Sequence, residues 1–231
     1  MTRTMNIEVL DTADLVAQRA AEFIADEARK AVAVQGRFVM AVSGGHTPWM
    51  MLRALGCADV PWPAIHVAQV DERVAPAGHP DRNLTHLRES LLDHAPLRAE
   101  QIYDMPVELP DLENAAAQYA ATLRRIAGSP PVLDLVHLGL GPDGHTASLV
   151  PGDAVLNIKD ADVAMTGPYQ GRRRMTLTYP MINRSQRVLW VVTGSEKAPM
   201  LKRLLAGDQS IPAGRICSER AVVIADEAAA R

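Results

Sequence analysis

The 231-residue sequence predicts an α/β fold with three layers: a doubly wound, mostly parallel sheet of the Rossmann-like kind, with helices on both of its faces. Two observations predict this fold. Short apolar runs alternate with longer segments in which apolar residues recur at helical spacing, from one end of the chain to the other. Several of the short runs are apolar at almost every position, which is typical of strands that helices cover on both faces of a parallel sheet.

Strands are expected where the apolar runs stop at Gly, Pro or acidic residues. FVMAVSG (38–44) ends in Ser-Gly, IHVAQVDE (65–72) in an acidic pair, VLDLVHLGLG (132–141) in a Gly-rich turn, and RVLWVVTG (187–194) in Gly. The remaining predicted strands are 101–107, 162–167, 175–180 and 221–226.

Helices are expected between these runs, where apolar residues recur near helical spacing. The predicted helices are 14–32, 48–55, 83–93, 112–128 and 196–207. The first 35 residues are expected to contain no more than one amphipathic helix. No repeat, low-complexity tract or Ser/Gly linker interrupts the alternation, so the chain is expected to form a single domain over 1–231.

Composition and charge limit the classes of partner. Hydrophobic residues make up 48% of the chain and charged residues 22%, which is ordinary for a globular protein. The formal net charge of -3 provides no broad positive field for nucleic acid or an anionic membrane, although a local basic pocket could hold a small anion.

Cysteine content and hydropathy indicate the cellular compartment in which the protein is expected. Cys57 and Cys217 have no metal-binding or redox spacing and are expected to be buried free thiols. No window of the sequence is long and apolar enough for a signal peptide or a membrane span, which leads us to expect a cytoplasmic protein.

The first motif that suggests a binding site lies at the end of the predicted strand 38–44 and continues into the next helix. Ser43, Gly44 and Gly45 are expected to form a loop whose backbone amides face a ligand. Thr47 is expected to be the N-cap of the next helix, with Pro48 at its first position. A Gly-rich loop before a helix N-terminus attracts a phosphate or carboxylate. The pattern matches neither the dinucleotide fingerprint nor the P-loop, so it does not indicate NAD or ATP.

A charged motif ends the second strand. Asp71, Glu72 and Arg73 arrive together there, and Asn83 follows in the next loop. Asp71 and Arg73 are expected where the crevice opens and are expected to pair with each other. Glu72 and Arg82 are expected to be surface charges.

The third strand end, LGLGPDGHTAS, carries a catalytic signature. Its glycines let the backbone turn sharply, so that Asp143 and His145 project at the edge of the sheet. An imidazole, with an ordinary pKa of about 6.5, can act as a base near neutral pH, and Asp143 could orient it. Thr146 and Ser148 are expected to cap the next segment of the chain.

The other histidines are given no catalytic role. His79 and His86 lack the compact spacing of metal ligands, so no metal site is predicted. His66 and His137 fall within strands and are expected in the core or behind the site.

Two later segments supply positive charge. Arg172, Arg173 and Arg174 precede a strand, and because most such runs are solvated, only Arg174, nearest the strand, is expected at the site. Lys197 lies just inside a predicted helix, where it opposes the helix dipole unless an anion lies nearby.

Five motifs together resemble one family. SGGHTP, DERVAP..HPDRN, LGLGPDGHTASLVPG, RRMTLTYPMIN and GSEKA occur in this order between residues 43 and 198 and are similar to motifs of the 6-phosphogluconolactonases of the pentose phosphate pathway. The resemblance implies the α/β fold shared with glucosamine-6-phosphate deaminases and ribose-5-phosphate isomerases. It also implies hydrolysis of 6-phospho-D-glucono-1,5-lactone to 6-phospho-D-gluconate without cofactor or metal.

The resemblance assigns catalytic roles. The histidine of the DGH motif falls on His145 and the arginine of the DER motif on Arg73. His145 would take a proton from the attacking water, with Asp143 orienting its ring. Arg73, beside Asp71, would stabilise the negative charge on the former carbonyl oxygen.

The resemblance also assigns substrate contacts. The phosphate would be held by the amides of the loop 43–45, by Arg174 and by Lys197. Thr47 and Asn83 complete the expected substrate-binding residues.

The sequence departs from the family pattern at two positions. Arg82 stands where relatives commonly have Ser before the Asn, which alters the hydrogen bonding around Asn83. Val150 stands where relatives commonly have Phe, which changes packing.

Two other functions fit parts of the pattern. A glucosamine-6-phosphate deaminase or isomerase shares the Gly-Gly loop and the DGH segment, but is expected to have DEY in place of DER and Asn-Glu-Pro after the third motif. A sugar-phosphate sensor of a transcription regulator would need a DNA-binding module, for which the first 35 residues leave no room. The expected partner is therefore a small sugar phosphate, bound by a monomer or homodimer.

Overall fold

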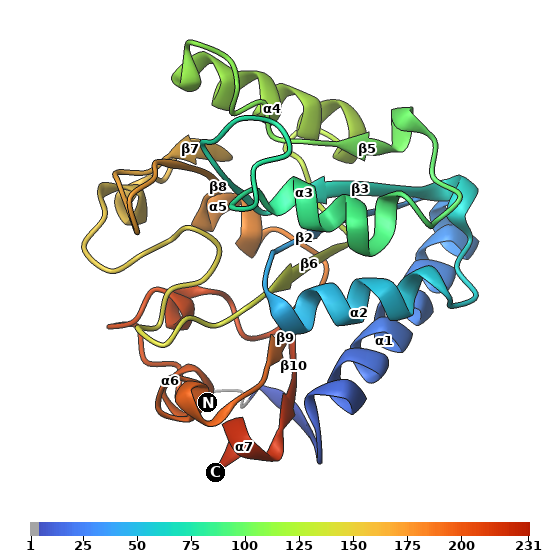
Figure 1. The fold of residues 1–231 in the computed structure, drawn as a ribbon, viewed down its shortest axis with the longest axis vertical. Helices are drawn as coiled ribbons and strands as arrows, with labels where there is room; N and C mark the ends of the chain where they lie inside the picture. Colours follow the sequence, from blue (N-terminus) through green and yellow to red (C-terminus); the bar gives the residue numbers. More distant parts are fainter. Residues whose placement is uncertain (1–4) are drawn as a thin grey trace.

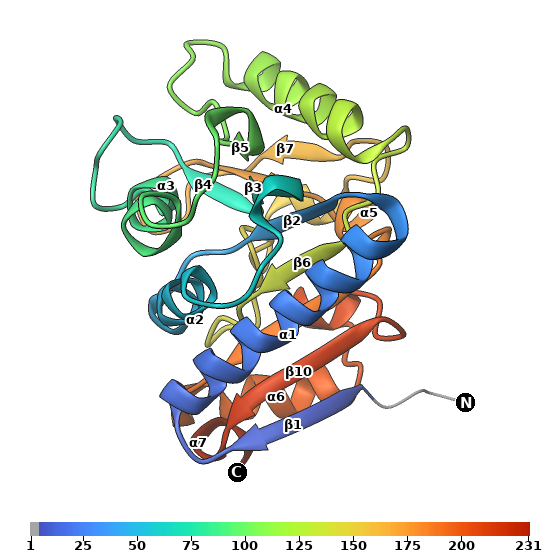
Figure 2. The ribbon, with the colours of Figure 1, turned by 90° about the vertical axis from the view of Figure 1, so that its right-hand side faces the viewer.

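The computed structural model describes residues 5–231. Its centre is a seven-stranded sheet in which all paired strands are parallel (Figure 1, Figure 2). In spatial order the strands are β1 (Asn6–Leu10), β10 (Ala221–Asp226), β9 (Val188–Val192), β6 (Leu135–Leu138), β2 (Phe38–Val42), β3 (Ile65–Gln69) and β5 (Ile102–Tyr103).

A second, antiparallel sheet and the helices complete the fold. The second sheet has the order β4 (Asp71–Arg73), β8 (Arg174–Leu177) and β7 (Val163–Met165). The helices are α1 (Ala13–Gln35), α2 (His46–Gly56), α3 (Asn83–Leu87), α4 (Leu112–Ala127), α5 (Tyr179–Asn183), α6 (Ala198–Leu205) and α7 (Glu227–Ala230). A π-helical turn, Arg88–Leu92, continues α3, and 3-10 turns lie at Trp62–Ala64, Ala99–Gln101, Ala154–Asn157, Ser195–Lys197 and Ala213–Arg215.

The large sheet separates two apolar cores, which explains why most positions of its inner strands are apolar. In β2, Phe38, Met40 and Val42 contact the core under α1 and α2. The alternate residues Val39 and Ala41 contact the other core, under α4, α6 and the second sheet. Figure 1 shows these two groups of elements on opposite sides of the strands. Side chains of a strand alternate between faces, so a strand with both faces covered is apolar at most positions, and its few polar side chains, such as His137 in β6, are buried.

Local signals set the ends of the longer helices. Thr12 accepts a hydrogen bond from the Leu15 N–H at the start of α1, and Gly36, at φ 76°, ends that helix in the left-handed region. At the start of α4, the Asp111 carboxylate accepts a hydrogen bond from the Asn114 N–H.

The order of the strands creates a crevice. β2 and β6 are neighbours in the large sheet. The next strand of that sheet along the chain is β3 after β2, on one side, and β9 after β6, on the other side. In open α/β sheets ligands bind beyond the carboxyl ends of the strands at such a switch point. The loops that follow β2 and β6, which carry the predicted motifs 43–47 and 139–148, both lie at this edge.

The predicted fold class is confirmed, but several elements differ from the prediction, including α5, which begins inside the predicted strand 175–180, and α7, which the sequence pattern does not predict. The sequence pattern misses β1, because this edge strand is only half-buried and lacks a continuous apolar run. The predicted strand 65–72 divides at Val70 into β3 and β4, which belong to different sheets. The predicted strands 162–167 and 175–180 form β7 and β8 in the antiparallel sheet, because an apolar run does not reveal the direction of its partner.

The prediction of buried thiols is wrong. Cys57 and Cys217 are both free and exposed, since one follows the end of α2 and the other lies in a surface turn. Within residues 5–231, no helix has the length and apolar character needed to cross a membrane.

Candidate active site

A cavity of about 530 Å³ opens at the carboxyl edge of the large sheet. Its walls come from the loops that follow β2, β6 and β9, and from β4 and β8 of the second sheet. The cavity size is typical of small-molecule sites. Every predicted site residue except Asp143 lines this cavity, and Asp143 contacts a residue that does.

The Asp143–His145 pair has the geometry of an oriented base. The imidazole Nδ1 lies 2.5 Å from Asp143 Oδ1, and the His145 backbone N–H donates to the same oxygen at 3.1 Å. Burial alone would raise the pKa of Asp143, but the hydrogen bonds from His145 and from the Tyr169 hydroxyl outweigh burial and lower it. An ionised carboxylate only accepts hydrogen bonds, so Nδ1 carries the proton and Nε2 keeps a free lone pair.

A glycine makes room for the His145 ring. A Cβ added at Gly141 would lie 2.0 Å from His145 Nδ1, so no other residue fits there without moving the imidazole. Gly144, at φ 83°, adopts the left-handed conformation that turns the chain between Asp143 and His145.

Thr146 and Ser148 do not cap a helix, contrary to the sequence prediction. The chain after His145 forms a β-bridge between Thr146 and Leu149, and no helix begins there. Thr146 Oγ1 donates to the Gly139 carbonyl at 2.9 Å, which closes the loop after β6.

Asp71 and Arg73 both line the cavity, but the predicted ion pair between them is absent from residues 5–231. The Asp71 carboxylate instead accepts hydrogen bonds from Ser148 Oγ at 2.6 Å and from Asn83 Nδ2 at 3.2 Å. Arg73 donates to the Asp81 carbonyl at 2.7 Å. Asp71 is thus a buried acceptor that ties β4 to the loop after β6.

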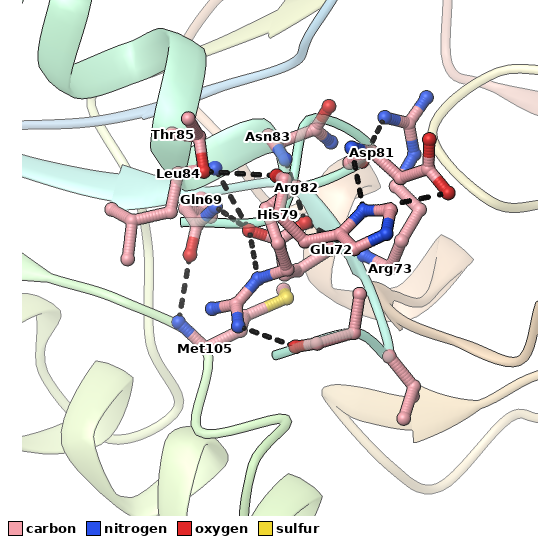
Figure 3. A network of polar contacts seen from close by, with 12 residues as sticks. Gln69, Glu72, Arg73, His79, Asp81, Arg82, Asn83, Leu84, Thr85 and Met105 are labelled. Carbon is pink, nitrogen blue, oxygen red and sulfur yellow. Dashed lines mark hydrogen bonds and ion pairs between the residues drawn. The ribbon is translucent and has the colours of Figure 1, made fainter. Parts of the chain in front are cut away.

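Glu72 and Arg82 are buried, so their prediction as surface charges is wrong. The Glu72 carboxylate accepts hydrogen bonds from the Gln69 side chain and from the backbone N–H groups of Arg73, Asn83 and Leu84 (Figure 3). These donors come from β4 and from the start of α3, which are adjacent only in the folded chain. Glu72 therefore sets the positions of two cavity residues, Arg73 and Asn83, although it does not itself line the cavity.

Arg82 supplies the charge that balances Glu72. Its Nε lies 3.1 Å from Glu72 Oε2, and its NH1 lies 2.8 Å from both the Ala75 carbonyl and Glu108 Oε1. A buried carboxylate needs a charged partner or several donors, and Glu72 has both. The departure from the family pattern at Arg82 thus adds an ion pair behind the site.

The loop after β2 presents backbone amides to the cavity. Gly45, at φ 133°, is the N-cap of α2, which begins at His46. The N–H groups of Gly44 and Gly45 make no hydrogen bond with the described part of the chain. A Cβ at Gly44 would lie 2.1 Å from Asn83 Oδ1, so this loop packs directly against Asn83. The unpaired amides and the helix N-terminus form an anion-binding edge.

Thr47 is not the N-cap, contrary to the sequence prediction. No side chain caps α2, and the Thr47 hydroxyl hydrogen-bonds Thr193 Oγ1 at 2.6 Å, joining the loops after β2 and β9. The hydroxyl points to a neighbouring strand end because the helix starts two residues earlier than the sequence suggests. Thr47 still lines the cavity.

His137 lies behind the loop 43–45, as predicted. Its Nδ1 accepts a hydrogen bond from the Ser43 N–H at 3.3 Å, and its carbonyl accepts one from Ser43 Oγ at 3.0 Å. Burial lowers the pKa of His137 to about 3, so its ring is neutral at physiological pH. His137 therefore supports the loop without adding charge to the site.

Of the three consecutive arginines, Arg174 alone lines the cavity. Arg172 pairs with Asp81 and Arg173 with Glu113, both at the surface. Burial, and then the neighbouring charge of Arg73, lowers the pKa of Arg174. Arg174 lies opposite Arg73 in the β4–β8 pairing, so two guanidinium groups share one end of the cavity.

Lys197 also lines the cavity and lies in the 3-10 turn that precedes α6. Its side chain is 23% exposed, and its Nζ lies 4.0 Å from Glu196 Oε1. Such a distant, exposed carboxylate leaves the ammonium group available to an anionic ligand.

Two features of the site carried no signal in the sequence. Tyr169, whose hydroxyl lies 3.1 Å from Asp143 Oδ2, comes from an irregular loop between two strands of the second sheet. Glu72 lies between Asp71 and Arg73, so nothing in the sequence distinguishes it from a surface charge. Within residues 5–231, no cluster of three or more His, Cys, Asp and Glu side chains has an arrangement that could hold a metal ion.

Replacing Glu72 tests the buried support of the site. Glu72→Gln should lower the free energy of unfolding by about 3–5 kcal/mol, because the buried Arg82 loses its charged partner. Glu108→Gln removes the half-exposed partner of the same arginine and should cost less than about 1 kcal/mol. Urea unfolding of both variants measures the difference. Equal losses in the two variants would contradict this account of Glu72.

Comparisons with known proteins identify the family of this chain. Residues 11–224 match the family model described as glucosamine-6-phosphate isomerases/6-phosphogluconolactonase. The chain is 37% identical to the 6-phosphogluconolactonase of Rattus norvegicus over 95% of this chain and 87% of that protein. It is 38% identical to the 6-phosphogluconolactonase of Nostoc sp. over 71% of this chain and 70% of that protein. The crystal structure of 6-phosphogluconolactonase from Thermotoga maritima is similar to this structure with a TM-score of 0.85 and 28% sequence identity. The match covers 96% of this chain and 98% of that chain. This chain belongs to the glucosamine-6-phosphate isomerase/6-phosphogluconolactonase family.

Proposed function

We propose that this protein hydrolyses 6-phospho-D-glucono-1,5-lactone to 6-phospho-D-gluconate, as a 6-phosphogluconolactonase of the oxidative pentose phosphate pathway. The observation that carries this proposal is the Asp143–His145 pair, whose free Nε2 belongs to the same cavity as Arg73 and the amides of Gly44 and Gly45. Base, cation and anion-binding edge are the three parts that hydrolysis of a phosphorylated lactone requires. The family and the names of the relatives support the same reaction.

His145 acts first as a base and then as an acid. Its Nε2 takes one proton from a water molecule as the water oxygen bonds to the lactone carbonyl carbon. The ring C–O bond then breaks, and the imidazolium returns the proton to the departing ring oxygen, which becomes a hydroxyl group. The new carboxylic acid releases a proton to solvent. Asp143 stabilises the imidazolium between the two steps.

Arg73 stabilises the charge that develops on the carbonyl oxygen. A positioned donor of this kind contributes on the order of 3 kcal/mol to transition-state stabilisation in other hydrolases. Two hydrogen bonds restrict Arg73: its guanidinium donates to the Asp81 carbonyl, and its backbone N–H donates to the buried Glu72 carboxylate. The guanidinium is therefore oriented before the negative charge develops.

The phosphate is held at the opposite end, by the amides of Gly44 and Gly45, the N-terminus of α2 and Lys197. Arg174 is expected from the sequence to join this group. Its register opposite Arg73 supports a place nearer the reacting carbon, and we propose that role for it instead. Because the substrate is a phosphorylated sugar of central metabolism, we propose that the enzyme acts in the cytoplasm.

A lactone assay tests the proposed function. The lactone is generated enzymatically from glucose 6-phosphate, and its loss is followed with and without the protein, because the lactone also opens spontaneously in water. Loss should accelerate in proportion to protein concentration. Loss at the spontaneous rate, or turnover of glucosamine 6-phosphate instead of the lactone, would refute the proposal.

Two substitutions separate chemistry from binding. His145→Ala should lower kcat by about 100-fold or more with little change in KM, because the base acts in the transition state. Lys197→Ala should mainly raise KM, because phosphate binding is the same in the ground state and the transition state. His94→Ala and Lys202→Ala, both outside the cavity, are the matched controls. Equal and small effects of His145→Ala and Lys197→Ala would contradict these roles.

A further inference from the structure

Tyr169 lies in the loop between β7 and β8 and contacts the catalytic pair from outside the cavity lining. The loop is a tight turn in which the backbones of Tyr169 and Arg172 exchange hydrogen bonds of 2.9 and 3.3 Å. Gln170, at φ 51°, and Gly171, at φ 80°, are both left-handed. A non-glycine residue in this region is strained, so the surrounding structure holds the turn in place.

The Tyr169 hydroxyl completes the hydrogen bonding of Asp143. It donates to Asp143 Oδ2 at 3.1 Å, while His145 occupies Oδ1. The hydroxyl also lies 3.5 Å from His145 Nδ1, and the two rings meet edge to face with centroids 5.5 Å apart. With two donors from His145 on Oδ1 and the Tyr169 hydroxyl on Oδ2, the carboxylate cannot rotate about its Cβ–Cγ bond without losing a hydrogen bond.

The Tyr169 ring contacts a cavity residue on its other side. The Arg174 guanidinium carbon lies 4.8 Å from the ring centroid, a distance typical of a cation–π interaction. The adjacent Gln170 accepts a hydrogen bond from Arg174 NH2 at 3.1 Å. The turn therefore holds Arg174 as well as the catalytic pair.

We propose that Tyr169 is a positioning residue of the active site: its hydroxyl orients Asp143, and through Asp143 the His145 imidazole, while its ring holds Arg174. The inference rests on the proposed lactone hydrolysis for its kinetic consequences. Burial, and then the hydrogen bond to Asp143, raises the pKa of Tyr169, which keeps the hydroxyl protonated as a donor.

Other charged groups surround this cluster from several elements. Those closest to Tyr169 are Asp143 and Arg174. The titratable side chains that line the cavity with His145 are His46, Asp71, Arg73, Arg174, Glu196, Lys197 and Asp226. Tyr169→Phe changes none of these groups and keeps the ring against Arg174, so a difference between it and the wild type reports the hydroxyl.

Tyr169→Phe should lower kcat about 10-fold and leave KM within about twofold. Without the hydroxyl, the Asp143 carboxylate is no longer held with Oδ1 against His145 Nδ1, so it stabilises the imidazolium less. The acid limb of the pH profile of kcat/KM, which reports the free base, should therefore move to lower pH. Tyr169→Ala also removes the ring and should raise KM further, through Arg174.

A second measurement needs no substrate. The ring 15N chemical shifts of His145 report which nitrogen carries the proton. They should indicate the Nδ1–H form in the wild type and a mixture of tautomers in Tyr169→Phe. Tyr103→Phe is the matched control, because the Tyr103 hydroxyl also lies 3.0 Å from a histidine nitrogen, in His66, and neither residue lines the cavity.

The outcomes separate the two proposals. Wild-type kcat, pH profile and ring 15N shifts in Tyr169→Phe would overturn the positioning role. So would an equal change in Tyr103→Phe. A wild-type protein without lactonase activity would refute the proposed function alone, since the 15N shifts would still decide whether Tyr169 orients His145.

Discussion

The constraint on which the site depends is that parallel strands all end at the same edge of a sheet. Residues 43–45, 139–145 and 193–197 are far apart in the chain, yet they follow β2, β6 and β9, which are neighbours or near neighbours in the sheet. The switch between β2 and β6 keeps this edge open, because no connection crosses it. The anion-binding amides, the base and the lysine thus converge without any dedicated domain.

The second sheet adds two cations to the cavity, the buried Arg174 and the partly exposed Arg73. β4 and β8 place Arg73 and Arg174 opposite each other, at a position where like charges repel. Two buried carboxylates, Glu72 and Asp71, and the Tyr169 ring against the Arg174 guanidinium offset this cost. An anionic substrate would relieve the remaining repulsion, which connects the electrostatics of the cavity to its proposed ligand.

The fold class and most cavity residues could be predicted from the sequence because both follow from local patterns. Apolar runs indicate strands, and the polar residues directly after them, such as Ser43 and His145, must reach the carboxyl edge. Contacts between separate loops leave no such pattern. In the sequence, Glu72 is one of several neighbouring charged residues, although in the structure its carboxylate accepts hydrogen bonds from the start of α3. Likewise, the partners of Asp71 and Thr47 are hydroxyl groups of Ser148 and Thr193, distant in the chain.

The central claim is that one cavity holds the reacting carbon between His145 and Arg73, with the phosphate on the loop after β2. A crystal structure of the complex with 6-phospho-D-gluconate tests it most directly. The account predicts the phosphate within hydrogen-bond distance of the Gly44 and Gly45 amides and of Lys197 Nζ, and the product carboxylate between His145 Nε2 and the Arg73 guanidinium. A product bound in the reverse direction, with its phosphate on Arg73, or bound outside this cavity, would contradict it.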